Sequence, residues 1–501
     1  MKVRFVIAGI LLSAIPMAVH SELLGEALPI ASLREVSGGP VAAHDPDRGR
    51  TLIVWEERRA GNGNILGQWI DDDGSPAEKP FPIAASPKEE RAPSVAYDPV
   101  SRRYLVAWLQ GEVGGALTLM GSFLEKEGGV GDPFLLFQPG RSPSDPVVAS
   151  AKGRFLLLWG EQREPNFRYP DLFGRFIDSK GKRLGEDFFV GRRLRGKPSV
   201  AFNSARGEFV VTWPFLAIPP EEMLTMARLF DAEGKPIAGP VLVGKGRPLS
   251  DDSPSVAFAP VGRHYLILWS RVTLQQGRPV AQRSEVMGQF LTEGGEIEAG
   301  PFSLSEPSES GLSPTISFEE GGAVALWVSR RSDAHSSIRG VRLLENGEIS
   351  GPVFSVSSPE SSQEQNADGP ELVPLSSPGV FLVVWRSVAS SGDAGLLCRR
   401  LGMLLLFPLG LPQGAVGAIY RIDLKAVQGE PPFQFRRVSG VLPPGLTLDA
   451  QEGSISGSPA QAGEYPLQVE VTDARGERDQ RGWLLSIRPA SKPVSFLQFL
   501  Q

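Results

Sequence analysis

TLIVW (51–55) is the first of seven short apolar runs that each end in a tryptophan. The other six are RYLVAW (103–108), RFLLLW (154–159), EFVVTW (208–213), HYLILW (264–269), AVALW (323–327) and FLVVW (381–385). Successive tryptophans are 53, 51, 54, 56, 58 and 58 residues apart. A repeat of about 50 residues with several short strands in each copy is typical of a propeller blade. The spacing therefore predicts an all-β fold with seven copies of one sheet.

Each copy contains the signals of four strands in a fixed order. The first is a short apolar strand after a proline, as in PSVAY (93–97) and PSVAF (198–202). Proline suits the first residue of a strand, where its missing N–H costs least. The second strand carries the tryptophan, and its unbroken apolar character indicates burial on both faces. ILGQWI (65–70) and FPIA (81–84) are examples of the shorter third and fourth strands.

The two ends of the repeat region complement each other. The seventh copy has three strand signals and no fourth, whereas LGEALPIAS (24–32) precedes the first copy and is similar to the fourth strand of that copy. We expect 24–32 to be the outer strand of the last blade, which would protect the open edges of the ring. The predicted architecture is a seven-bladed β-propeller over 22–402.

Composition restricts the location and the ligand classes. Residues 1–21 have a basic start, an apolar stretch and a small-residue cleavage site, which predicts a signal peptide and a secreted protein. The mature chain has 49 basic and 57 acidic residues, a net charge of −8 that argues against nucleic acid. We expect no integral membrane segment. With one cysteine, Cys398, no intrachain disulfide is possible, and with three mature histidines a histidine-rich metal site is unexpected.

The chain stops repeating near Met403. LPPGLTLD (442–449), GSISGSP (453–459) and VTDARG (471–476) follow in an order that resembles immunoglobulin-like domains of bacterial surface proteins. The resemblance covers 403–488 and implies a β-sandwich that acts as a stalk or interaction module, followed by a tail at 489–501. The tryptophan repeats are similar to a bacterial secreted repeat family with the pattern PSVAYD…YLVVW…GQxxDxxG, which implies the fold more than the role.

The candidate site residues are arginines four positions after a tryptophan: Arg59, Arg163 and Arg331. Loops leaving equivalent strands lie on one face of a propeller, so these side chains would form a ring able to hold an anionic group. The alternative is that each arginine pairs with a carboxylate of its own blade. Acidic turns such as DDDG (71–74) could bind calcium, but they are ordinary hairpin connectors and lack an EF-hand pattern. We expect no metal and no cofactor.

No catalytic motif occurs, and we assign no catalytic residue. The sequence favours a secreted or cell-surface binding or adhesion protein that is not an enzyme and that uses loops of the propeller face to bind an extracellular protein or glycan. Two alternatives stay open: a propeller-type carbohydrate-active hydrolase or lyase, and a structural scaffold of an envelope complex. We expect a monomer.

Overall fold

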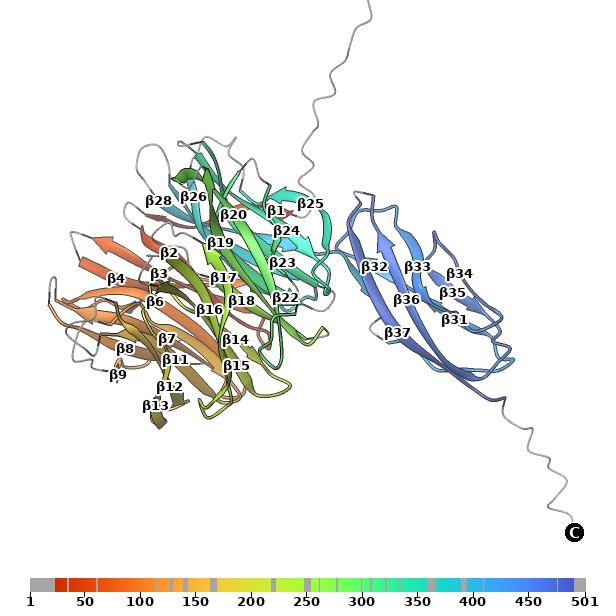
Figure 1. Cartoon of the computed structure of the whole chain (residues 1–501), viewed down its shortest axis with the longest axis horizontal. Helices are drawn as coiled ribbons and strands as arrows, with labels where there is room; N and C mark the ends of the chain where they lie inside the picture. The colour runs from red at the N-terminus through yellow and green to blue at the C-terminus, as the bar shows by residue number, and fades with distance from the viewer. Residues whose placement is uncertain are drawn as a thin grey trace, which may run out of the picture.

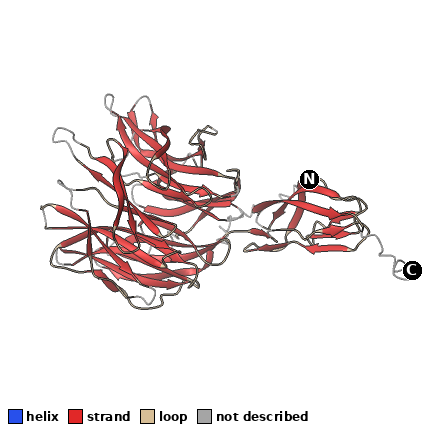
Figure 2. Cartoon of the chain, turned by 90° about the horizontal axis from the view of Figure 1, so that it is seen from below, coloured by secondary structure: helices blue, strands red, loops and turns tan. Residues whose placement is uncertain are grey.

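The computed structural model describes residues 23–33, 36–59, 62–112, 115–125, 129–137, 143–162, 169–217, 222–246, 254–260, 262–275, 278–298, 300–306, 309–319, 322–332, 335–357, 366–388, 394–408, 410–474 and 476–490. The predicted signal peptide lies outside them. Figure 2 shows a chain built of strands, and the described residues contain no helix that could span a membrane. Figure 1 shows two bodies of unequal size, the larger formed by β1 to β28.

The larger body begins with five antiparallel sheets of four strands, each sheet using consecutive strands. The first sheet contains β2 (Val36–Asp45), β3 (Arg50–Arg59), β4 (Asn62–Asp71) and β5 (Phe81–Ala84). The second contains β6 (Glu89–Asp98), β7 (Arg103–Gly111), β8 (Leu117–Leu124) and β9 (Phe134–Phe137). The third contains β10 (Val147–Ala151), β11 (Arg154–Glu161), β12 (Asp171–Asp178) and β13 (Arg183–Gly191).

The fourth sheet contains β14 (Ser199–Asn203), β15 (Glu208–Ala217), β16 (Glu222–Phe230) and β17 (Pro236–Gly246). The fifth contains β18 (Ser255–Ala259), β19 (His264–Gln275), β20 (Arg278–Thr292) and β21 (Phe302–Ser303). The sixth group contains β22 (Ser310–Glu319), β23 (Gly322–Ser332), β24 (His335–Leu343) and β25 (Ile349–Ser355).

The last group combines strands from both ends of the repeat region. It contains β26 (Asn366–Pro374), β27 (Val380–Val388), β28 (Ala394–Gly402) and β1 (Leu23–Leu33). β1 pairs antiparallel with β28, from Leu23 opposite Leu401 to Leu33 opposite Ala394. One parallel bridge, between Ser336 and Asn366, joins this group to the sixth, so the two count as one eight-stranded sheet. The N-terminal strand therefore occupies the fourth place that the seventh repeat leaves unfilled.

The seven repeat tryptophans all lie in the second strand of a group and are almost completely buried. Trp55, Trp108, Trp159, Trp327 and Trp385 have no exposed surface, and Trp213 and Trp269 are 2% and 4% exposed. Some indoles lie against a glycine of the preceding sheet. A Cβ at Gly191 in β13 would stand 2.3 Å from the Trp213 ring. Gly244 in β17 lies against Trp269 in the same way, so in these two places the last strand of one sheet makes room for the tryptophan of the next.

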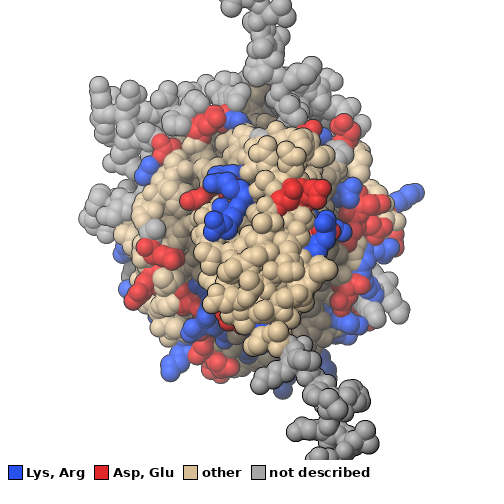
Figure 3. Space-filling model, turned by 90° about the vertical axis from the view of Figure 1, so that its right-hand side faces the viewer, with Lys and Arg blue, Asp and Glu red and all other residues tan. Residues whose placement is uncertain are grey.

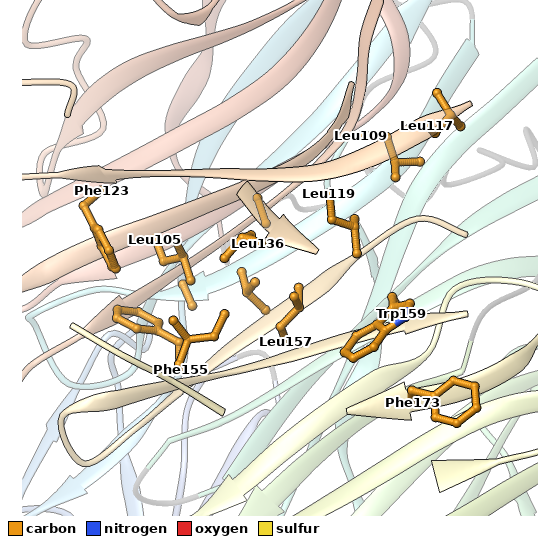
Figure 4. Packing of buried hydrophobic residues seen from close by; sticks show 14 residues of the cluster. Leu105, Leu109, Leu117, Leu119, Phe123, Leu136, Phe155, Leu157, Trp159 and Phe173 are labelled. Atoms are coloured by element: carbon orange, nitrogen blue, oxygen red, sulfur yellow. The ribbon is translucent and has the colours of Figure 1, made fainter. Parts of the chain in front are cut away.

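The core consists of separate apolar layers between consecutive sheets. One layer joins Leu105 and Leu119 of the second sheet to Leu157 and Trp159 of the third, and Figure 4 shows these side chains interdigitating. Five more layers join the other consecutive groups. The seventh joins the last group to the first, because Ile30 and Val384 pack with Trp55. The first strands make contacts in the same cyclic order, from β2 with β6 to β26 with β2.

The smaller body is a sandwich with its own core. Its strands are β29 (Leu405–Phe407), β30 (Gly414–Ala415), β31 (Tyr420–Asp423), β32 (Lys425–Val427), β33 (Gln434–Gly440), β34 (Leu446–Leu448), β35 (Ser454–Gly457), β36 (Gly463–Thr472) and β37 (Arg478–Arg488). The sheets have the orders β30-β37-β36-β33, β31-β35-β34 and β29-β32. Ile455, Leu467 and Trp483 belong to the core between them.

The two bodies meet at the β24–β25 hairpin. The guanidinium of Arg342, in β24, forms a buried ion pair with Glu477, at the turn between β36 and β37. The Arg478 N–H donates to the Ser350 hydroxyl at 3.0 Å. Viewed from the side of the sandwich, uncharged residues cover most of the near surface (Figure 3), while basic and acidic side chains occur in small patches around it.

Candidate binding site in the axial cavity

The first strands of all seven groups line one cavity of about 790 Å³. Its wall comes from the starts of these strands and includes the repeated prolines Pro40, Pro93, Pro198, Pro254, Pro314 and Pro370. Polar atoms form most of the wall. Pockets for small ligands have volumes of roughly 300–1,000 Å³. This is the part of the molecule where every repeat contributes to one surface, so it is the first candidate for a binding site.

The strand register shifts just before the proline in several first strands. Shifts occur between Arg91 and Ser94 in β6 and between Asp368 and Glu371 in β26. Ala92 and Ser313 have positive φ angles of 52° and 49°, a region that few residues other than glycine adopt. Bulges of this kind redirect side chains. Here they turn the residues before the proline toward the rim of the cavity, and Arg91 and Ala92 both line it.

A ladder of hydroxyls links the first strands of neighbouring sheets. The residue after the proline accepts a backbone N–H from the next sheet. Ser94 accepts from Val148 at 3.0 Å, and Ser199 accepts from Val256 at 3.2 Å. Ser255 accepts from Ile316 in the same way. Because edge strands leave backbone groups unpaired, these serines satisfy donors of the scaffold.

Glu371 occupies the same position in the last group, where a carboxylate replaces the hydroxyl. It accepts the N–H of Ala42 in β2. The Glu371 side chain lines the cavity, and part of its surface is exposed to the cavity. The rest of the side chain is surrounded by protein. Desolvation raises the pKa of Glu371 to about 7, and the nearby Lys197 ammonium opposes this rise. A carboxyl group that titrates near neutral pH thus lies inside the cavity.

The rim carries further charges, and some are used by the scaffold. Arg58 donates from Nε to Glu56 at 2.9 Å and from Nη2 to Glu89 at 3.5 Å. The second oxygen of Glu56 accepts the Ala92 N–H at 3.2 Å. Asp145 is exposed on the rim, immediately before β10. These contacts make the Arg58–Glu56 pair a support for the bulge of the next sheet.

Arg91 differs from these groups. It is half-buried and lines the cavity. Among the described residues its guanidinium has no ion-pair partner, and its buried Nε has no hydrogen-bond acceptor. An arginine fork without an acceptor is unusual in a buried position and is suited to bind a carboxylate with two parallel bonds.

The arginines singled out from the sequence cannot be compared with this site. Arg59 is the last residue of β3 and Arg331 lies in β23, but their side chains are not described, and Arg163 lies outside the described residues. The predicted arginine ring stays a prediction. Among the described residues, no group of three histidine, cysteine, aspartate or glutamate side chains is placed to hold a metal ion.

The sequence also contains a signal for the rim, next to the repeated prolines. Arg91, Asp145 and Lys197 stand one or two residues before a repeated proline, and Glu371 stands directly after one. Aligning the seven repeats on their prolines, instead of on their tryptophans, places all four charges within two residues of a repeated proline. The alignment does not show which charges form ion pairs or hydrogen bonds, because their partners lie in neighbouring sheets.

Comparison with known proteins supports the sandwich by sequence. Residues 407–487 match the family model described as "Putative Ig domain". They form an Ig-like domain. The match corresponds to β29 through β37. No curated protein matches the chain.

Solved structures similar to the chain include β-propeller proteins. The β-propeller domain of the Trilobed protease from Pyrococcus furiosus is 10% identical, with 75% of this chain and 96% of that chain covered and a TM-score of 0.43. The α-L-arabinofuranosidase Arb93A from Fusarium graminearum is 12% identical, with 75% and 98% covered and a TM-score of 0.44. Likeness at this level does not extend to activity.

Proposed function

We propose that the larger body is a closed seven-bladed propeller and that the protein is an exported binding protein without catalytic activity. Its ligand enters the axial cavity at the rim formed by the starts of the first strands. The observation that carries this proposal is Arg91, a half-buried guanidinium that lines the cavity and has no acceptor among the described residues. Scaffold residues rarely leave such a group unsatisfied.

The size of the cavity suggests how a large partner would bind. A volume of about 790 Å³ accepts a small ligand or a chain end, and it is too small for a folded domain. The partner is therefore an extracellular protein or glycan that inserts one protruding segment. The Ig-like domain would act as a spacer, and its buried Arg342–Glu477 contact would hold it at a fixed angle to the propeller.

Blocking the rim tests this site. In Asp145→Trp a large ring replaces an exposed rim carboxylate and covers the cavity mouth. Asp132→Trp is the matched control, because Asp132 is also exposed and also precedes a proline, but it lies before the outer strand β9. The mature protein is first screened against immobilised glycans and secreted proteins, and ligands are then measured with both variants. We expect Asp145→Trp to lose binding with an unchanged melting temperature and Asp132→Trp to keep it. Equal binding by both variants would contradict the site.

Hydrolysis is a second candidate function, favoured by Glu371. A general acid needs a pKa near the working pH, and burial raises the pKa of Glu371 to about 7. A screen of glycosidic and peptide substrates between pH 5 and 9 decides between the two functions. Turnover by the purified protein that disappears in Glu371→Gln would replace the binding assignment, whereas absence of turnover across the screen supports it.

A further inference from the structure

We propose that the ligand of the axial cavity is an acidic glycan and that Arg91 binds the carboxylate of one of its uronic acid units. This inference rests on the proposed binding function and specifies its ligand. It depends on three features of the rim: a mismatch within the second sheet, the engagement of the neighbouring carboxylates, and the acceptors on the rest of the wall.

The mismatch appears when equivalent positions of different sheets are compared. The residue two before the repeated proline lies opposite the residue after the tryptophan. In the last group these are Asp368 and Arg386, which form two hydrogen bonds of 2.8 and 2.5 Å. In the second sheet they are Arg91 and Leu109, and Leu109 is fully buried. Within the described part of the chain, the guanidinium of Arg91 thus has no partner in the place where Asp368 has one.

Two other sheets also show complementary pairs at this position. In the third sheet the Ser144 hydroxyl accepts the Gly160 N–H at 2.8 Å. In the sixth group Leu312 lies opposite Val328, and both are buried. In each of these three sheets the two opposite residues match each other: one pair is hydrogen-bonded, one is apolar and one is ionic. Arg91 opposite Leu109 departs from these three pairs.

The carboxylates nearest in sequence to Arg91 already have other partners. Glu56 accepts from Arg58 at 2.9 Å and from the Ala92 N–H at 3.2 Å, one bond to each oxygen. Glu90 is fully buried and accepts the Ser86 N–H at 3.0 Å and the Gln110 amide at 3.2 Å. The bond to Ala92 also fixes the bulge beside Arg91. Among the described residues, the guanidinium of Arg91 is therefore left without an anion.

The remaining wall favours a sugar as the carrier of the carboxylate. Asp145 and Glu371 place carboxylate groups on the same cavity. Such groups repel a second anion, but they accept hydrogen bonds from hydroxyls, which a uronic acid carries around its ring. The wall is mostly polar and contains no aromatic residue among those described. A ligand with one carboxylate per several hydroxyls fits this distribution better than an apolar peptide.

The experiment measures binding of three probe sets to the full mature chain by calorimetry. The first set contains trimers of galacturonic, glucuronic and mannuronic acid, the second contains their methyl esters, and the third is the tripeptide Gly-Gly-Ala with a free carboxylate. We expect at least one uronic acid trimer to bind and its ester to bind about ten-fold more weakly or worse, because a charge-assisted pair is lost. Binding should also weaken with salt.

Variants connect the effect to Arg91. Arg91→Gln should reduce binding of the trimer about ten-fold or more, and Arg91→Lys should restore part of it because the charge returns without the planar fork. Arg183→Gln, which changes an arginine of β13 in the third sheet, is the control and should bind as the wild type does. Melting temperatures show whether each variant is folded.

The outcomes separate this inference from the function on which it rests. No binding of any uronic acid trimer, equal binding of trimer and ester, or an unchanged affinity in Arg91→Gln overturns the inference. Binding of the tripeptide alone also overturns it and identifies a peptide ligand. If another ligand from the screen still requires an open rim at Asp145, the proposed binding function stands without the acidic glycan.

Discussion

The tryptophan positions and the rim positions of the seven repeats follow opposite rules. Every second strand ends its apolar run in a buried tryptophan, and each of these indoles is at most 4% exposed. At the rim, the residue two before the proline changes from Arg91 to Ser144 to Leu312 to Asp368. Repeated residues perform a task that each sheet needs, namely filling the layer against its neighbour. Residues that differ between sheets are where a regular scaffold can acquire recognition.

The rim itself divides into structural and unmatched charges. Asp368 and Arg386 satisfy each other within one sheet, whereas Arg91 faces a leucine. The same position can therefore serve the fold in one repeat and remain available in another. Substitutions should have large effects on stability in the layers between sheets, moderate effects at paired rim charges, and little effect at Arg91.

The largest effect is expected from removing β1, Leu23–Leu33. This strand pairs with β28, and its Ile30 and Ala31 are buried in the layer beside Trp55. Its loss would open a sheet edge and expose the layer between the last group and the first. Burial of one large aliphatic side chain contributes about 1.5–3 kcal/mol, and Leu23 and Leu24 are also partly buried, so we expect a loss of more than about 3 kcal/mol. Chemical denaturation measures it, and an unchanged midpoint would contradict a closed ring.

Truncation of one repeat tryptophan should come next. Trp213→Ala should cost about 3–5 kcal/mol in unfolding free energy, because a buried ring leaves a cavity between the third and fourth sheets. Gly191→Ala should cost about 1–3 kcal/mol by the opposite mechanism, since its Cβ would overlap the same ring. Leu484→Ala, at a side chain that is 61% exposed, is the control. If Trp213→Ala lowered the unfolding free energy by less than about 1 kcal/mol, the packing of the repeat tryptophans between sheets would not be what stabilises the fold.

Glu371→Gln should change the pH dependence of stability. The pKa of Glu371 is raised from 4.5 to about 7 in the folded protein, so the folded state holds a proton that the unfolded state has released between these values. The unfolding free energy is therefore not reduced by this group below pH 4.5, and it falls as the pH rises from 4.5 to about 7. The variant should be about 1–3 kcal/mol more stable than the wild type at pH 8 and equal to it at pH 4. A difference that does not vary with pH would contradict the buried position.

The smallest effects compare the two rim charges directly. Asp368→Asn should cost about 1 kcal/mol, because Arg386 loses a partly exposed ionic partner. Arg91→Gln should change the unfolding free energy by less than about 0.5 kcal/mol, because no described contact is lost. Urea denaturation of both variants measures the difference. If Arg91→Gln were the more destabilising of the two, Arg91 would be a structural residue, and the contrast between a paired Asp368 and an unpaired Arg91 would be wrong.

The sequence predicted the strands well because its strongest signals are local. An apolar run with a terminal tryptophan marks a buried strand by itself, and the LPPGLTLD and GSISGSP motifs locate the Ig-like domain from composition and order. The rim could be predicted only in part. Charged residues within two positions of the prolines are visible in the repeats, but Arg91 stands out only because Glu56 is bonded to Arg58 and to Ala92 of the next sheet. Such pairings between sheets have no signature in a single repeat.

The position of a bound ligand would show directly whether Arg91 recognises a carboxylate. A crystal structure of the mature protein with a bound uronic acid trimer would show whether the rim recognises an acid. We expect the trimer in the axial cavity, with one carboxylate at about 2.7–2.9 Å from the Arg91 guanidinium nitrogens and sugar hydroxyls bonded to Asp145 or Glu371. A trimer bound on the outer strands, or held in the cavity with its carboxylates away from Arg91, would contradict it.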